Sequence, residues 1–391
     1  MQLLPDDERG LQRALTLARD AAAFASPNPT VGCVLMRDGQ ILGEGAHIYD
    51  NRDHAEIVAL KQAASLGHSP HRATACVTLE PCSHQGRTGP CADRLVAVGI
   101  GRCVVATMDP NPLVRGQGLA KLQRAGIEVV VADPASRIGE DARRLNDAFA
   151  FSIQHCRPFV TLKAAISRDG FLAPRQRERV APHWLTGRAA RADVQSLRHA
   201  SDAIVTGIGT VLADNPSLTD RTGLPRRRSL LRVILDSQLR LPPEAAMLQG
   251  VESDVLIAAS PLASEDREAA LRACGAAVLR VPLATDGKHL DLHAVLQALH
   301  QRNIRSVLLE AGSALNAAFL EADLVDRVVL YRSQSVLGEG AIPFAAEYVS
   351  AETLEERLTA ATRASFPHDD DSDQDDTRVI GYLHDPWQPV L

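Results

Sequence analysis

At 391 residues the chain is too long for one ordinary core, which predicts two domains, with three as the alternative. Its hydrophobic share of 45% is near the globular average, so each domain can be well packed. The formal net charge of -6 gives no electrostatic reason to bind a polyanion, so we do not expect a nucleic-acid partner. The N-terminus carries acids where a signal peptide needs basic and apolar runs, and no segment is apolar enough to span a membrane. Seven thinly spread cysteines disfavour a disulfide framework, so we expect a cytoplasmic protein.

Helix and strand patterns alternate through the first third of the chain. Helical patterns occupy residues 11–24, 54–67, 91–99 and 119–126, and strand patterns occupy residues 31–45, 73–81, 102–110 and 127–133. Asp38-Gly39 divides the first strand pattern into two strands joined by a tight turn. This spacing predicts parallel crossover units in a three-layer α/β domain that ends near Leu145.

The pattern restarts after residue 158 and predicts a second α/β sheet. Strand patterns occupy residues 159–167, 203–207, 230–237, 254–260, 276–282, 306–312, 327–333 and 377–383, with helices at 189–200, 292–303 and 315–322. The acidic run 368–376, HDDDSDQDD, interrupts the last strand. Its like charges predict a solvated loop, with a cation or partner site as the alternative.

Four residues of the first block have the spacing of a catalytic zinc site. His54 and Glu56 open a helix, and Cys82 and Cys91 follow a strand, which gives the pattern H-x-E…P-C-x8-C. A catalytic zinc ion needs three protein ligands and one open position, and His54, Cys82 and Cys91 supply that set. We expect Cys82 at a helix N-terminus, which would lower the pKa of its thiol. The alternative is that His54 caps a helix and the cysteines belong to the core.

The same pattern is typical of zinc deaminases, in which the glutamate moves protons and does not bind the metal. Zinc lowers the pKa of a bound water to about 7, and Glu56 would take its proton and deliver it to the departing ammonia. His47 lies just before the signature in GEGAH, where it contacts substrate or is a surface histidine.

Longer segments resemble one family across nearly the whole chain. SPNPTVGCVL, HAEIVAL, LEPCSHQGRTGPC and ATMDPNPLVRGQGL in the first block, and LKAAISRDG, HWLTG, SDAIVTGIGTVLADNPSLTDR and LLEAGSALNAAFL in the second, resemble the bifunctional riboflavin-biosynthesis deaminase/reductase family. The resemblance implies an N-terminal cytidine-deaminase-like three-layer α/β/α domain over residues 1–146. A linker over residues 147–158 and a dihydrofolate-reductase-like α/β domain over residues 159–391 would follow.

The family's activity is a two-step conversion. The resemblance implies zinc-dependent deamination of 2,5-diamino-6-ribosylamino-4(3H)-pyrimidinone 5′-phosphate, a small phosphorylated aminopyrimidine. NADPH-dependent reduction of its ribosyl group to a ribityl chain would follow, in a homo-oligomer. No single arginine can be assigned to the 2′-phosphate of NADPH, so the sequence does not decide between NADPH and NADH.

The resemblance also carries site residues. In the first domain the catalytic residue would be Glu56 and the substrate contacts Asn28, His84, Arg87 and Thr88. In the second, the substrate contacts would be Arg198, Leu218, Arg221 and Glu310, and the cofactor contacts Ala165, Trp184, Thr186, Thr210, Asp214, Ser237, Gly312, Ser313, Ala314 and Leu315. Asp214 would also relay a proton. For Asn28 and Asp214 the alternative is ordinary turn chemistry, and the loop between the cysteines could simply space the ligands.

The second block departs from the family pattern in three places. SRDG at 167–170 stands where SLDG is usual, APH at 181–183 lacks the family's substrate-contacting serine, and YRSQS at 331–335 replaces the usual Ala-Pro. An alternative function therefore stays open, in which residues from about 159 onward are a non-catalytic nucleotide-binding or assembly module of a monofunctional deaminase. A nucleoside or nucleic-acid base deaminase is a further alternative, disfavoured by the acidic balance and the fused second block.

Overall fold

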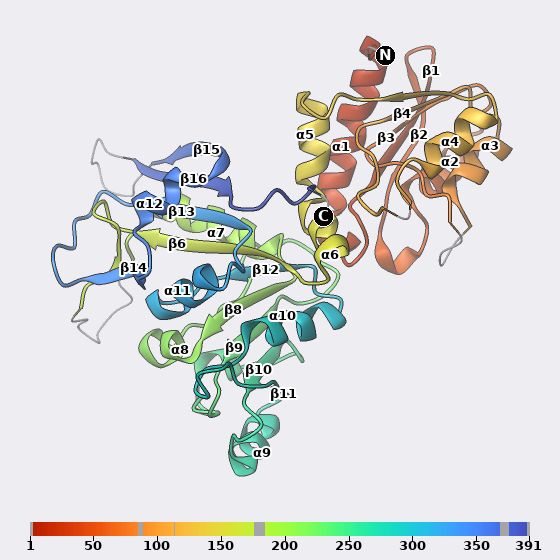
Figure 1. Ribbon diagram of the computed structural model, residues 1–391. Helices are drawn as coiled ribbons and strands as arrows, with labels where there is room; N and C mark the ends of the chain where they lie inside the picture. Colours follow the sequence, from red (N-terminus) through yellow and green to blue (C-terminus); the bar gives the residue numbers. More distant parts are fainter. Residues whose placement is uncertain (1–2, 85–88, 113, 176–183, 368–374, 389–391) are drawn as a thin grey trace. The chain divides into compact units, whose positions relative to one another are not determined.

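The computed structural model describes residues 3–84, 89–112, 114–175, 184–367 and 375–388, which form two compact units (Figure 1). The first unit ends at Cys156, and the second runs from Arg157 to Pro386. Trp387 belongs again to the first unit, where its indole Nε1 donates to Asp147 Oδ1 at 3.0 Å. No helix in the part of the chain that the structure describes has both the length and the apolarity needed to cross a bilayer.

Residues 147–158, which we expected to form a linker, contain a helix of the first unit. Helix α6 spans Asp147–His155 and buries Ala150 and Phe151, so its apolar face is part of a packed domain. The boundary between the units follows Cys156, inside the range expected for the linker, and the φ of 53° at Cys156 ends α6 in a left-handed conformation.

The first unit is a five-stranded sheet with helices on both faces. The strand order is β2-β1-β3-β4-β5, with bounds β1 Gly32–Arg37, β2 Gln40–Ala46, β3 Thr74–Val77, β4 Arg102–Val105 and β5 Glu128–Val131. Strands β3, β4 and β5 are parallel, and β1 is antiparallel to β2 and β3. The β1–β2 turn has φ of 51° at Asp38 and 76° at Gly39, the positive values that a tight hairpin turn requires.

Alternate strand residues of this sheet face different helices. Cys33 and Leu35 pack toward α2 (Ala55–Ser65), α3 (Cys91–Ala97) and α4 (Gln117–Arg124). Val34 and Met36 pack toward α1 (Pro5–Ala25) and α5 (Arg137–Arg144), on the other face of the sheet (Figure 1). The predicted three-layer domain is thus confirmed. Because β3 and β4 are parallel, the segments that follow them emerge at the same edge of the sheet.

The second unit is built on a nine-stranded sheet. The order is β11-β10-β9-β8-β12-β6-β13-β16-β15, with bounds β6 Phe159–Ile166, β8 Ala203–Gly207, β9 Leu231–Leu235, β10 Val255–Ala259, β11 Ala277–Arg280, β12 Ser306–Leu309, β13 Arg327–Arg332, β15 Thr359–Phe366 and β16 Asp376–Tyr382. The run from β11 to β13 is parallel, and β16 is antiparallel to β13 and β15.

Helices cover both faces of this sheet. Helices α10 (Leu292–Gln301), α11 (Ser313–Glu321) and α12 (Ala351–Glu356) pack in one core, and α7 (Arg188–His199), α8 (Ile208–Asp214) and α9 (Glu265–Ala273) contribute to two others. The neighbouring residues Ile204 and Val205 of β8 belong to different cores, as expected of a strand buried on both faces. The predicted second α/β domain is therefore confirmed.

Several elements of the second unit were missed or misread. The short strands β7 (Phe171–Ala173) and β14 (Ile342–Glu347) pair in a separate small sheet, and β15 is an exposed edge strand without apolar alternation. Of the acidic run, residues 368–374 lie outside the described residues. Asp376 is fully buried at the start of β16, where its Oδ2 accepts the N–H of Gly187 at 2.6 Å. The expected solvated loop is therefore wrong for Asp376.

Candidate active sites

Three predicted metal ligands converge in the first unit. His54 precedes α2, Cys82 lies in the segment after β3, and Cys91 is the first residue of α3. His54 Nδ1 lies 3.4 Å from Cys82 Sγ and 3.3 Å from Cys91 Sγ, and the three atoms lie within 4.8 Å of one another. Tetrahedral zinc with ordinary bond lengths would place nitrogen and sulfur ligands about 3.5 Å apart. The three residues therefore fit a zinc ion.

Cys82 does not open a helix, which corrects our expectation for that residue. Helix α3 begins only at Cys91, with Pro90 as its N-cap, and the described residues directly after Cys82, Ser83 and His84, are not helical. The first amide of α3 nevertheless reaches Cys82, since Cys91 N–H donates to Cys82 Sγ at 3.3 Å. Hydrogen bonds from the Cys91 side chain and from His54, together with this Cys91 N–H, lower the pKa of Cys82 despite its burial. The thiolate that zinc needs is therefore favoured.

Glu56 stands beside this triad without being part of it. It is the second residue of α2 and is only 3% exposed. Burial raises the pKa of its carboxyl group, the Cys82 charge adds to that effect, and His54 opposes it. A buried carboxyl next to the ligands can exchange a proton within the site, as the proposed role requires.

His47 is buried, so the alternative of a surface histidine is wrong. Its Nδ1 lies 2.8 Å from Asp53 O and its Nε2 lies 3.0 Å from Asn28 Nδ2. Burial lowers the pKa of His47, so the ring is neutral, donates from Nδ1 and accepts the Asn28 amide at Nε2. The His47 and His54 rings are 5.4 Å apart, edge to face, which places the predicted contact Asn28 near the metal ligands.

The loop between the two cysteines is only partly described. His84 is exposed. Arg87 and Thr88 lie outside the described residues, so their contacts with substrate stay predictions. Asp109, to which we assigned no role, belongs to this region: burial raises its pKa to about 6, and His84, Cys82 and Glu80 act on its charge. Its position after a buried parallel strand was the signal in the sequence.

A buried charge cluster marks the second unit. Arg198 on α7 contacts Glu310 through two hydrogen bonds, from Nε to Oε1 at 2.7 Å and from a terminal nitrogen to Oε2 at 3.0 Å. Lys163 on β6 lies 3.6 Å from the same carboxylate. Burial opposes ionisation of Glu310, but the charges of Lys163 and Arg198 outweigh it and lower its pKa to about 2. Lys163 was missed because it sits inside an apolar strand pattern.

The segment after α8 is attached to this cluster. Arg198 donates to Thr219 O at 3.0 Å, directly after Leu218, which is buried and has a φ of 53°. The backbone N–H of Arg221 donates to Gln195 Oε1 at 3.0 Å, while the Arg221 residue is exposed. Arg198 thus contacts both Glu310 and the segment that carries Leu218 and Arg221, and the role of these four residues in binding substrate stays a prediction.

Most predicted cofactor residues lie at the carboxyl ends of adjacent parallel strands. Ala165 is near the end of β6, Ser237 follows β9, and Gly312, Ser313, Ala314 and Leu315 follow β12 and begin α11. Thr210 of α8 follows β8, and its Oγ1 would lie 3.6 Å from a Cβ placed on Gly312. This edge is where open α/β sheets bind nucleotides, and the α11 N-terminus suits a phosphate.

The remaining predicted cofactor residues, Trp184, Thr186 and Asp214, do not lie directly at the ends of these strands. Trp184 is 61% exposed and stacks under the guanidinium of Arg191 at 5.2 Å, while Thr186 is buried. Asp214 ends α8 and is exposed, and Asn215 after it has a φ of 43°. A turn residue and a proton relay both remain compatible with that position, so the role of Asp214 stays a prediction.

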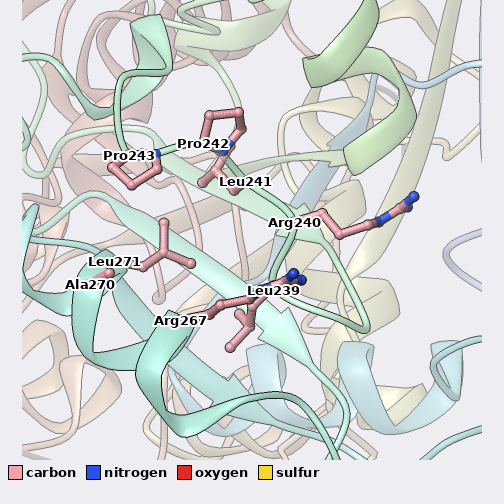
Figure 2. A pocket seen from close by; sticks show the side chains of 8 residues that line it. All are labelled: Leu239, Arg240, Leu241, Pro242, Pro243, Arg267, Ala270 and Leu271. Atoms are coloured by element: carbon pink, nitrogen blue, oxygen red, sulfur yellow. The ribbon is translucent and has the colours of Figure 1, made fainter.

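A pocket of about 330 Å³ is lined by residues 239–243, which follow Ser237 in the sequence, and by three residues of α9 (Figure 2). Arg240 and Arg267 are among its lining residues. The guanidinium of Arg267 donates to Gln238 O at 3.2 Å, and Arg240 Nε is 3.8 Å from the buried carboxylate of Asp236. Both arginines are thus connected to the segment after Ser237, Arg240 by its position three residues along the chain and Arg267 by its hydrogen bond to Gln238.

We expect one zinc ion per chain in the wild-type protein and almost none in Cys91→Ser, because a serine hydroxyl is a much poorer zinc ligand than a thiolate. Elemental analysis of the purified proteins measures this. Cys156→Ser changes an exposed cysteine and should keep the ion. A zinc-free wild type that gains no metal on addition, or a zinc-loaded Cys91→Ser, would contradict the site.

Comparisons with known proteins match both units. Residues 4–107 match the cytidine and deoxycytidylate deaminase zinc-binding region, and residues 158–365 match the RibD C-terminal domain. The riboflavin biosynthesis protein RibD of Actinobacillus pleuropneumoniae is 38% identical over 331 residues, 84% of each chain. The Escherichia coli (strain K12) protein of the same name is 38% identical over 347 residues, 86% of this chain and 89% of its own length.

Two solved structures extend this similarity to the fold. Acinetobacter baumannii RibD superposes with a TM-score of 0.78 at 35% identity, covering 96% of this chain and 99% of that one. A diaminohydroxyphosphoribosylaminopyrimidine deaminase/5-amino-6-(5-phosphoribosylamino)uracil reductase from Thermotoga maritima gives a TM-score of 0.78 at 31% identity, with the same coverage. The zinc triad and the Lys163–Glu310–Arg198 cluster fall inside the two matched regions.

Proposed function

This chain belongs to the RibD family of riboflavin-biosynthesis proteins, and from that premise we propose the reaction and the residues that serve each of its two units. The protein is bifunctional, with a zinc-dependent deaminase domain followed by an NADPH-dependent reductase domain. The observation that carries the deaminase is the convergence of His54, Cys82 and Cys91 beside the buried Glu56.

The proposed substrate is the aminopyrimidine 5′-phosphate named for the Thermotoga relative. Its deamination replaces a ring amine by a carbonyl, consumes water and releases ammonia. The reduction then adds a hydride and a proton to the ribosyl group and opens it to a ribityl chain. Because the phosphate is present throughout, both sites would need groups that bind it, and we propose Arg87 and Arg221 for this role.

In the deaminase, zinc when bound would lower the pKa of a water molecule toward neutrality. Glu56 would take the proton from that water and return it to the leaving amine, because its buried carboxyl group sits beside the ligands. The neutral His47 orients the Asn28 amide, leaving the Asn28 side-chain oxygen to accept a hydrogen bond from the pyrimidine. His84 and Thr88 are proposed as further contacts.

In the reductase, the cofactor supplies the hydride. Lys163, Glu310 and Arg198 would orient the ribosyl group, since this buried cluster offers both donors and an ionised acceptor. Asp214 is proposed to relay the proton. Arg240 and Arg267 are proposed to bind the 2′-phosphate that distinguishes NADPH from NADH, because they line the pocket formed by α9 and the segment after Ser237.

A monofunctional deaminase with a non-catalytic second unit is not favoured. The second unit matches the family's own C-terminal domain over residues 158–365, and it retains the buried ionised cluster. A cytoplasmic location and a homo-oligomeric state stay proposals, as does the lack of a nucleic-acid partner. None of the seven cysteines, all of which lie among the described residues, forms a disulfide, which suits a reducing compartment.

Glu56→Gln should bind zinc as the wild type does and lose ammonia release by about a thousandfold, because an amide cannot shuttle a proton. Elemental analysis and an ammonia assay with the aminopyrimidine phosphate measure the two quantities. The exposed Glu140→Gln is the control for loss of one negative charge in the same unit. Turnover of Glu56→Gln within a few-fold of wild type would assign the base to another residue.

Asp214→Asn should stop NADPH oxidation and let the deaminated pyrimidine accumulate, because only the second reaction loses its proton relay. Cys91→Ser should stop deamination but still reduce supplied deaminated intermediate, since each unit has its own core. Mass spectrometry of products, with and without NADPH and from supplied deaminated intermediate, separates the two. Loss of both activities in either folded variant would contradict two independent sites.

Replacing both Arg240 and Arg267 by Ala should raise KM for NADPH by about tenfold or more and leave KM for NADH nearly unchanged, because NADH has no 2′-phosphate to lose. Initial rates with each cofactor measure this. Arg272→Ala, in the same helix as Arg267 but paired with Glu268, is the control. Equal changes for the two cofactors would show that the arginines do not read the 2′-phosphate.

A further inference from the structure

Glu80 is a buried carboxylate that neither reaction uses directly. It lies between β3 and Cys82 and is 4% exposed. Its donors in the described part of the chain are backbone amides: Gly116 at 2.9 Å and Asp109 at 3.2 Å to Oε2, and Gly118 at 3.0 Å and Leu119 at 3.4 Å to Oε1. One side chain therefore holds both ends of the connection between β4 and α4.

The start of α4 also contacts the ligand-bearing segment through its backbone. A Cβ on Gly118 would lie 2.0 Å from Pro81 O, so only glycine allows this approach. The backbone N–H of Glu80 donates to Thr107 O at 3.0 Å, which joins the same two segments again. The connection after β4 is thus fixed against the residues that immediately precede Cys82.

Asp109 brings this connection into the deaminase site. The residue is 8% exposed, and its Oδ1 accepts the N–H of Asn111 at 2.8 Å. Its N–H donates to Glu80 Oε2 at 3.2 Å, and Glu80 stands two residues before the ligand Cys82 and four before the predicted substrate contact His84. The Asp109 turn is therefore tied through Glu80 to the segment that carries Cys82 and His84.

We propose that Glu80 is a positioning residue of the deaminase, which fixes the Asp109 turn and the start of α4 as a wall of the substrate site. It acts through the four backbone amides and touches neither the metal nor the reacting atoms. This role rests on the proposed deaminase function. It differs from a role in holding the zinc ligands, because its hydrogen bonds go to the connection after β4 and not to the ligand side chains.

Glu80→Gln keeps the volume of the side chain but turns one acceptor oxygen into an NH₂ group. That group would face two N–H donors, so two of the four hydrogen bonds are lost. We expect faster amide exchange in the peptide covering residues 108–119, with zinc content and reductase turnover unchanged. We expect KM for the pyrimidine to rise about ten- to a hundredfold and kcat to change much less.

Hydrogen exchange by mass spectrometry, elemental analysis and steady-state kinetics are measured on the full chain, with Glu140→Gln as the charge-matched control. Three results for Glu80→Gln would each overturn the proposal. They are a wild-type KM together with wild-type amide exchange in residues 108–119, a fall in kcat without a rise in KM, and loss of zinc. If Glu80→Gln does not fold, Glu80→Asp, which keeps the charge on a shorter stem, should show a smaller rise in KM, and a wild-type KM there would overturn it. If the wild type does not deaminate the pyrimidine, the proposed function is refuted instead. The two failures can be told apart, because amide exchange is measured without substrate.

Discussion

Burying a carboxylate is unfavourable unless hydrogen bonds or opposite charges replace its contacts with water. Each unit contains one such carboxylate, and the two have different kinds of partner. In the first unit Glu80 is surrounded by backbone amides, so its partners are fixed by the fold of one connection. In the second, Glu310 is held by the side chains of Lys163 and Arg198, which come from a strand and a helix distant in sequence. Both arrangements place a fixed negative charge at the edge of a sheet, where the strand ends converge.

Because the partners differ, the surroundings of Glu80 and Glu310 differ in how far they can move. Amides of a connection cannot move without moving the chain, so Glu80 makes that part of the site rigid. Arginine and lysine side chains can exchange one acceptor for another, and Arg198 already divides its hydrogen bonds between Glu310 and Thr219 O. The reductase cluster therefore has donors that can turn toward an incoming ligand, whereas the deaminase wall is set before the substrate arrives.

Sequence patterns singled out the three residues that the structure brings together, His54, Cys82 and Cys91, because they lie in short motifs with a spacing typical of zinc ligands. Most strands were also found, since strands buried on both faces give continuous apolar runs. Lys163 and Asp109 were missed because their importance depends on partners brought together by tertiary structure. The placement of Cys82 at a helix start was wrong because proline-cysteine after a strand looks the same whether a helix or a loop follows. Helix α9 was not predicted, because it is highly charged and, in the described structure, buries only Leu271, which gives little apolar periodicity.

Two of the departures from the family pattern meet in the folded chain. Arg168 N–H donates to Ser335 O at 2.8 Å, and Arg332 donates to Arg168 O at 3.0 Å. Asp169 accepts the amides of Leu337 and Gly338, and together with Ser167 these outweigh burial and lower its pKa to about 2. Residues 181–183, the third departure, lie outside the described residues. The SRDG and YRSQS segments therefore contact each other through hydrogen bonds, so these two departures belong to one local structure.

The return of Trp387 to the first unit has a consequence for the order of events during synthesis. Its indole donates to Asp147 and lies under the guanidinium of Arg143 at 5.0 Å, yet more than two hundred residues separate it from α6 in the sequence. A ribosome must translate the whole reductase before these contacts can form. The deaminase domain, although made first, thus gains this packing partner only after the reductase has been translated, and a deaminase domain excised at Cys156 would lack it.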